Sequence, residues 1–138
     1  IPLSAGCEVT MEANPGTVEA ERFSGYQQAG INRISIGVQS FDAEKLTRLG
    51  RIHGPQEAER AAKLATGLGL RSFNLDLMHG LPDLSIEQAL SDLRRTIALN
   101  PPHLSGEGLS IEPNIFVAPR PSAAHHHYEH RDILAQVR

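Results

Sequence analysis

Cysteine is almost absent from the sequence, because Cys7 is the only one among 138 residues. One thiol cannot form an internal disulfide, and it cannot supply the several thiolates that a structural zinc site or an iron–sulfur cluster requires. A basic excess is missing as well, since 13 Lys and Arg residues stand against 16 Asp and Glu residues. No predicted helix carries a basic stripe, so we expect no nucleic-acid partner.

Long apolar runs are also missing, and this excludes another class of protein. No stretch approaches the roughly 20 apolar residues that a membrane-spanning helix requires, and the first residues do not resemble a signal peptide. We therefore predict a cytoplasmic protein without a membrane span. The length of 138 residues fits a single domain. Because the chain starts at Ile1 and enters a predicted strand almost at once, we interpret it as a fragment.

Three short strands are present, and each is expected to end in a polar residue. They are predicted over residues 8–12, 33–38 and 72–77, each followed by a loop and a helix. Alternation sends successive side chains to opposite faces. The apolar face is expected to carry Val9, Met11, Ile34, Ile36, Val38, Phe73, Leu75 and Leu77. The polar face is expected to carry Thr10, Glu12, Ser35, Gly37, Gln39, Ser72, Asn74 and Asp76.

A polar face has two common explanations, which are solvent and a ligand site. A parallel strand covered on both sides is apolar along nearly its whole length, and these strands are not. The long, helix-like segments between them require parallel crossovers and favour a ligand site at the strand ends. We predict an α/β fold with parallel strands and crossover helices, either part of a TIM-like barrel or an open doubly wound sheet.

Capping signals predict the helices between these strands. They are expected over residues 17–30, 42–50, 54–69 and 85–100. Thr17 and Asp42 are placed to cap the first two, and Ser85 with Gln88 forms a capping box for the last. A further strand is expected near His103, although two glycines interrupt its pattern.

The end of the chain differs in composition from the rest. Residues 118–124 are rich in Pro and Ala, and four histidines follow at His125, His126, His127 and His130. Such a tract can bind a metal, but its composition favours a disordered polar tail. We predict a barrel-like part over residues 1–114 and an irregular, His-rich tail over residues 115–138.

Four sequence blocks then point to a known family. They are EVTMEANPG at residues 8–16, GINRISIGVQSF at 30–41, LGRIHG at 49–54 and FNLDLMHGLP at 73–82. In this order they resemble the central part of the HemW and HemN group, which are radical S-adenosylmethionine (SAM) proteins related to the oxygen-independent coproporphyrinogen III oxidase. The wording IHGPQEA and DLMHGLP is closer to the HemW branch, described as haem chaperones.

The resemblance implies a partial TIM-like barrel that holds SAM and a 4Fe-4S cluster at the strand ends. The positions that match SAM-contacting residues of the family are Glu12, Gln39, Arg51, Asp76 and, more weakly, Ser110. Carboxylates accept hydrogen bonds from hydroxyl or ammonium groups, an amide both donates and accepts, and a guanidinium binds a carboxylate. Without the family, Arg51 would be a solvated helix-end charge and Asp76 a cap of the next loop. Haem or a porphyrin is a further small-molecule ligand that the resemblance implies.

The chain also departs from the family pattern. The three-cysteine motif that binds the cluster is absent, and Gly106, Glu107 and Gly108 stand where large aromatic residues are usual. We therefore expect no cleavage of SAM to the 5′-deoxyadenosyl radical by this chain alone. The exposed edge strands of an incomplete barrel predict self-association.

Two alternatives stay open. The first is a non-catalytic haem-binding chaperone. The second is an unrelated ligand-binding α/β barrel, such as an aldolase, which would need a lysine at a strand end. Lys45 and Lys63 both fall on predicted helices, and Lys45 is expected on a solvated face.

Overall fold

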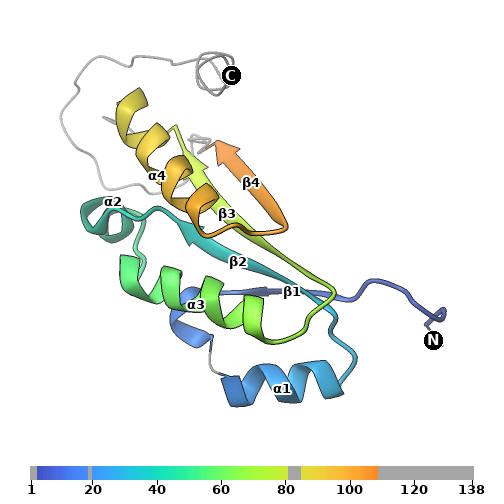
Figure 1. Ribbon diagram of the computed structural model, residues 1–138. Coiled ribbons are helices and arrows are strands. Elements are labelled where there is room, and N and C mark those ends of the chain that lie inside the picture. Colours follow the sequence, from blue (N-terminus) through green and yellow to red (C-terminus); the bar gives the residue numbers. More distant parts are fainter. Residues whose placement is uncertain (1–2, 19, 81–84, 109–138) are drawn as a thin grey trace, which may run out of the picture.

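Four parallel strands lie side by side in the order of the chain, β1-β2-β3-β4 (Figure 1). The computed structural model describes residues 3–18, 20–80 and 85–108. Within them the elements are β1 (Thr10–Ala13), η1 (Pro15–Thr17), α1 (Ala20–Gln28), β2 (Arg33–Gln39), α2 (Ala43–Arg48), α3 (Pro55–Gly67), β3 (Ser72–His79), α4 (Ile86–Ala98) and β4 (His103–Gly108). All three strand pairs are parallel, which confirms the predicted α/β fold with crossover helices.

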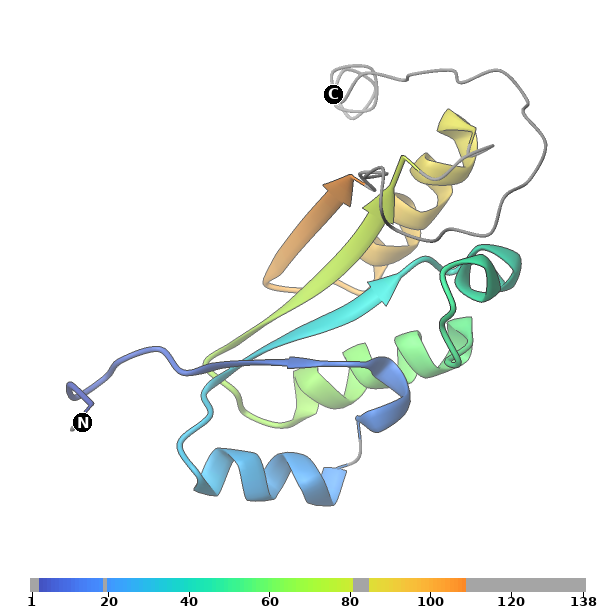
Figure 2. The same cartoon turned by 180° about the vertical axis from the view of Figure 1, so that it is seen from behind.

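The apolar face of the sheet packs against helices. Helices α3 and α4 cover it, and Figure 2 shows the strands in front of these two helices. Helix α1 adds Phe23 to the same core. Ile34, Ile36 and Leu75 have no exposed surface. They meet a row of small residues on α3, namely Ala58, Ala61, Ala62 and Ala65. The predicted apolar face is therefore confirmed, and the small alanines let α3 lie close to the strands.

Local capping positions two of the helices as expected. The Asp42 carboxylate accepts a hydrogen bond from the Lys45 backbone N–H at 3.0 Å at the start of α2. At the start of α4, Ser85 Oγ accepts from the Gln88 N–H at 3.2 Å, and Gln88 Oε1 accepts from the Ser85 N–H at 3.0 Å. Both helices thus begin where the sequence predicts, because a side-chain oxygen satisfies their first free N–H groups.

The first helix begins later than predicted. Pro15 fixes the backbone in a 3₁₀ turn, η1, and the hydroxyl of Thr17 donates to the Asn14 carbonyl at 2.8 Å. Helix α1 starts only at Ala20. The prediction that Thr17 caps this helix was wrong, because its hydroxyl closes the turn that precedes it.

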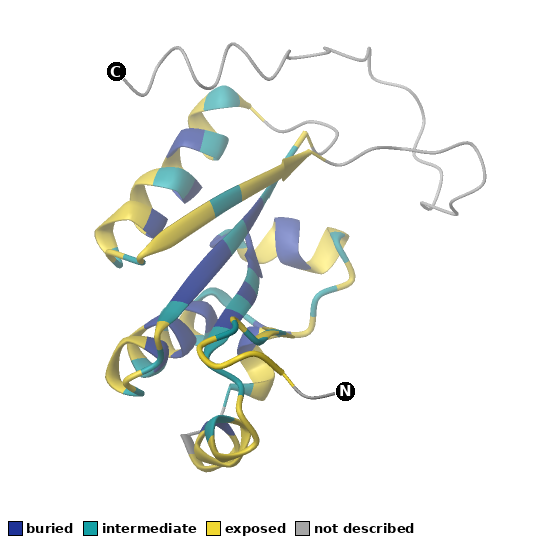
Figure 3. Cartoon of the chain, turned by 90° about the vertical axis from the view of Figure 1, so that its right-hand side faces the viewer, coloured by how far each residue is buried: buried dark blue, intermediate teal, exposed yellow. Residues whose placement is uncertain are grey.

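Two strand boundaries also differ from the predictions. Strand β1 starts at Thr10 because the side chain of Asn32 takes the Val9 N–H at 2.9 Å. Strand β3 continues to His79, since β4 pairs with it to its end. Asp76 therefore lies inside β3 and not at its end. Figure 3 shows β2 and β3 largely buried, whereas β4 is an exposed edge strand.

Ser110 and the His-rich tail over residues 115–138 lie outside the described residues, so both stay predictions. Within residues 3–18, 20–80 and 85–108, no helix has the length and apolar character needed to cross a membrane.

Candidate functional site

Polar side chains from three strands meet around Asp76, on the face of the sheet opposite the helices. Ser35 of β2 donates from Oγ to Asp76 Oδ2 at 2.7 Å. Asn74 of β3 donates from Nδ2 to Oδ1 at 2.5 Å, and the hydroxyl of Ser105 on β4 donates to the same oxygen. The carboxylate is thus oriented by three donors before any ligand arrives.

Asn74 connects this network across the sheet. Its Nδ2 also lies 3.1 Å from Ser35 Oγ and 2.9 Å from Ser105 Oγ. Alternation correctly placed Ser35, Asn74 and Asp76 on the polar face. It did not identify Ser105 as a partner of Asp76, because that contact depends on the register between β3 and β4, which pairs the two residues.

Gln39 ends β2 in an unusual backbone conformation. Its φ is 66°, in the left-handed region that costs a non-glycine residue roughly 1–2 kcal/mol. The register between β2 and β3 shifts just before it. Ile36 pairs with Leu75 but Gln39 pairs with Leu77, so β2 carries one extra residue at this point. Such a bulge re-aims a side chain at a strand end. Gln39 is only 8% exposed as a whole, but its amide keeps some accessible surface and has no hydrogen bond to any described residue.

Gly37 makes room for this amide. A Cβ at Gly37 would lie 2.9 Å from Gln39 Nε2 and 4.0 Å from Asn14 Oδ1. Arg51, in the loop after α2, donates from Nη1 to the same Asn14 oxygen at 3.1 Å. Gln39, Asn14 and Arg51 are therefore neighbours at the carboxyl ends of β1 and β2. Asn14 was not among the predicted site residues, although its place directly after β1 is a signal that points to it.

Glu12 lies on the same polar face but at its edge. It pairs in register with Ser35, which in turn bonds Asp76. Glu12 is exposed, and in the described part of the chain no side chain is hydrogen-bonded to it. The structure thus places Glu12, Gln39 and Asp76 on one face, with Gln39 buried, Asp76 half-buried and Glu12 open.

The comparisons with known proteins decide the family. Residues 3–95 match the model of the Radical SAM superfamily. The chain belongs to the radical SAM superfamily. It is similar to the heme chaperone HemW of Escherichia coli (strain K12), with 74% identity, and to that of Haemophilus influenzae (strain ATCC 51907 / DSM 11121 / KW20 / Rd), with 63%, each over 121 residues. In both cases the match covers 88% of this chain and 32% of the relative, so the chain spans about a third of those proteins.

A solved structure agrees with this assignment. The coproporphyrinogen III oxidase HemN from Escherichia coli, a radical SAM enzyme, superposes with a TM-score of 0.74 and 31% identity. The match covers 82% of this chain and 26% of that one. The resemblance to the HemW and HemN group is therefore confirmed. So is the fold class, because the parallel sheet corresponds to part of the TIM-like radical SAM barrel.

Membership of the radical SAM superfamily implies two bound groups, SAM and a 4Fe-4S cluster. The amide of Gln39, which keeps some accessible surface, and the space that Gly37 leaves beside it fit a polar ligand such as SAM. Residues 3–18, 20–80 and 85–108 contain no site that fits the 4Fe-4S cluster. No group of three His, Cys, Asp or Glu side chains there is arranged to hold a metal, and Cys7 is a half-buried free thiol.

Proposed function

We propose that this chain forms the SAM-binding segment of a HemW-like protein that handles haem. The observation that carries the proposal is the 74% identity to the Escherichia coli heme chaperone HemW across 88% of the chain. The polar face supports it from the structure, because the accessible amide of Gln39 and the fixed carboxylate of Asp76 can both bond a polar ligand. A role in porphyrin synthesis like that of HemN belongs to the same proposal.

The proposed contacts follow from the chemistry of each side chain. Gln39 donates to and accepts from SAM, and Arg51, held by Asn14, binds its carboxylate. Asp76 and Glu12 accept hydrogen bonds from ribose hydroxyl or ammonium groups. The residues proposed to contact SAM are Glu12, Gln39, Arg51, Asp76 and Ser110. SAM with the cluster would supply radical chemistry in the whole protein, while this segment binds and orients it.

Three further statements belong to the proposal. We place the barrel part at residues 1–114 and the His-rich tail at residues 115–138. The cytoplasmic location is proposed with them. Self-association through the strand edges is supported by β4, whose side chains are largely exposed in an edge position.

A titration with SAM tests the proposed site. In the ¹⁵N-labelled chain we expect the side-chain NH₂ signals of Gln39, Asn14 and Asn74 to shift as SAM is added. The NH₂ group of Asn32 is a control within the same molecule, because it bonds the Cys7 carbonyl at 2.8 Å at the opposite end of the sheet. Uniform shifts of all four signals, or none at saturating SAM, would contradict the assignment.

A second candidate function is haem binding without catalysis. It is favoured by the similarity to the HemW proteins of Escherichia coli and Haemophilus influenzae, which are heme chaperones. Haemin added to the chain should then give a shifted Soret band, and replacing one histidine by Ala should reduce it. His53, His79 and His103 are the described histidines to replace first. An unchanged haemin spectrum in the wild-type chain would exclude this function.

A further inference from the structure

The left-handed conformation of Gln39 begins with a local turn, because the Ser40 N–H donates to the Val38 carbonyl at 2.8 Å and closes a turn around Gln39. A left-handed backbone at a residue other than Gly persists only where the surrounding structure fixes it. The residues that follow Gln39 are deeply buried, with 0% of Ser40 and 3% of Phe41 exposed. Besides this local turn, the side chain of Ser40 and the backbone N–H of Phe41 bond a helix about fifty residues further along the chain.

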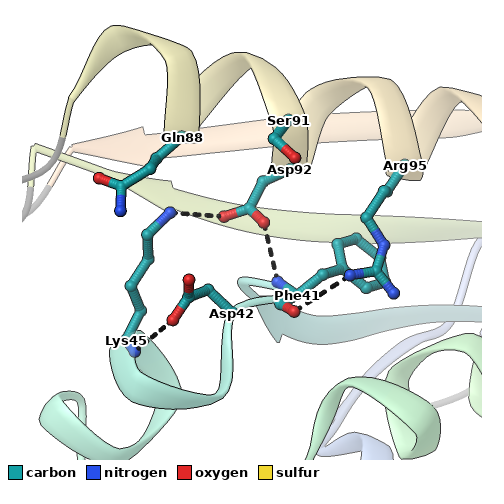
Figure 4. Close-up of a pocket in the computed structure, with 7 residues that line it drawn as sticks. All are labelled: Phe41, Asp42, Lys45, Gln88, Ser91, Asp92 and Arg95. Carbon is teal, nitrogen blue, oxygen red and sulfur yellow. Dashed lines mark hydrogen bonds and ion pairs between the residues drawn. The ribbon is translucent and has the colours of Figure 1, made fainter.

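Asp92 on α4 provides these contacts from the helix-covered side of the sheet. Its Oδ2 accepts a hydrogen bond from Ser40 Oγ at 2.6 Å. Its Oδ1 accepts from the Phe41 N–H at 3.0 Å (Figure 4). Ser40 Oγ in turn accepts from the Asp42 N–H at 3.0 Å. One carboxylate thus binds both the side chain and the backbone of the segment directly after Gln39.

Asp92 is itself held in place by charge. Asp92 and Lys45 are each 6% exposed as residues, and Lys45 Nζ lies 3.3 Å from Asp92 Oδ2. A buried carboxylate without such a partner would be strongly unfavourable. Arg95 completes the arrangement, because it donates to the Phe41 carbonyl at 3.2 Å and its guanidinium lies 4.7 Å from the centre of the Phe41 ring.

We propose that Asp92 is a positioning residue for Gln39. By fixing Ser40 and Phe41 from behind the sheet, it keeps Gln39 in the left-handed conformation that presents the amide to SAM. The ligand half of this inference rests on the proposed function. The conformational half does not, since it concerns the backbone of the free chain.

A cavity beside Asp92 makes the inference testable by substitution. It has a volume of about 120 Å³ and is lined by Phe41, Asp42, Lys45, Gln88, Ser91, Asp92 and Arg95 (Figure 4). This space lets a changed side chain rearrange, so we expect Asp92→Asn to fold. The amide keeps an acceptor for the Phe41 N–H, but its NH₂ group cannot accept from Ser40 and Lys45.

The experiment measures the backbone of Gln39 and the affinity for SAM separately. In the labelled chain, the three-bond HN–Hα coupling and the intraresidue HN–Hα NOE of Gln39 report its φ. We expect Asp92→Asn to move Gln39 out of the left-handed region and to weaken SAM binding about tenfold, as the loss of one good hydrogen bond would. Ser40→Ala should act in the same direction without leaving Lys45 unpaired, and it preserves the test if Asp92→Asn does not fold.

Asn32→Ala is the matched control for a purely structural effect. The Asn32 side chain also makes two partly buried hydrogen bonds, but at the far end of the sheet. It accepts from the Val9 N–H and donates to the Cys7 carbonyl. It should lower stability while leaving the φ of Gln39 and the affinity for SAM unchanged. If it weakens SAM binding as much as Asp92→Asn does, Asp92 has no special link to Gln39.

A double variant separates the two halves of the inference. When Gln39→Ala has already removed the amide, Asp92→Asn should cause little further loss of affinity. An equal loss in both backgrounds, or a Gln39 that stays left-handed in Asp92→Asn and Ser40→Ala, would overturn the proposal. If φ changes but Gln39→Ala binds SAM normally, the conformational half is supported and the assignment of Gln39 to the SAM site fails.

Discussion

The two faces of the sheet are made by alternate residues of the same strands, yet they do different work. On β3, Phe73, Leu75 and Leu77 are at most 8% exposed and pack against helices. Between them, Asn74 and Asp76 bond polar side chains of both neighbouring strands. Burial of apolar surface supplies most of the stability of such a domain, whereas the hydrogen bonds of the polar face add less but fix the orientation of the Asp76 carboxylate.

This contrast teaches where stability and ligand geometry can be separated. A residue on the helix-covered face should affect the free energy of unfolding first, and a residue on the polar face should affect ligand binding first. Asp92 is the exception that connects them, because it lies on the helix side and holds the segment after Gln39. Substitutions on each face test whether the effects on the free energy of unfolding and on ligand binding are separate.

The largest expected effect is that of Ile36→Ala. Ile36 has no exposed surface, and its removal leaves a cavity in the core, so the free energy of unfolding should fall by about 2–5 kcal/mol. Guanidinium denaturation followed by circular dichroism measures this loss. Ser35→Ala, the preceding residue on the opposite face, is the control and should cost about 1 kcal/mol. Similar losses for the two variants would mean that the faces do not differ as described.

Asp76→Asn should affect binding more than folding. The substitution keeps the shape but removes one acceptor from Ser35 or Ser105, which lowers stability by about 1 kcal/mol. The affinity for SAM should fall further, because the negative charge is lost. Glu87→Gln removes the same charge from a side chain that is 77% exposed, so it is the matched control. Equal SAM affinities in the two variants would contradict a ligand role for Asp76.

Local patterns explain why much of this fold was predictable. Side-chain alternation in Ile34, Ile36 and Leu75 gave the buried face, and short-range capping by Asp42 and Ser85 gave two helix starts. These signals work because both ends of each interaction lie within a few residues. Thr17 is the exception, because its hydroxyl bonds the Asn14 carbonyl in the preceding turn and does not cap the following helix.

Contacts between distant segments were not predictable in the same way. Lys45 was expected on a solvated helix face, but it is buried against Asp92, which lies 47 residues later. That expectation was wrong because only the packing of α4 beside α2 brings the two charges together. The left-handed Gln39 was missed for the same reason, as its cause lies partly in the bulge of β2 and in Asp92. Glu12, Gln39, Arg51 and Asp76 as SAM contacts stay a proposal.

Gly37→Ala should change binding with little change in stability. The new Cβ would lie 2.9 Å from Gln39 Nε2, and the flexible amide can move away at a cost below about 1 kcal/mol. The amide then no longer lies beside Asn14, and SAM affinity should fall in the titration. Gly25→Ala, where nothing lies within 4 Å of the added Cβ, is the control and should bind SAM normally. A Gly37→Ala chain with unchanged affinity would show that this space is not used.

The smallest effect on stability is expected for Asn14→Ala. This variant therefore separates ligand binding from stability most clearly. Asn14 is exposed, so the free energy of unfolding should change by less than about 0.5 kcal/mol. Yet its Oδ1 holds the Arg51 guanidinium at 3.1 Å, and without it Arg51 loses a fixed orientation toward the SAM carboxylate. SAM affinity should fall several-fold, and Asn14→Asp, which keeps the acceptor oxygen, should restore it. If Asn14→Ala binds SAM as tightly as the wild-type chain, Arg51 is positioned by something other than this contact, and the polar face orients its ligand through the Asp76 network alone.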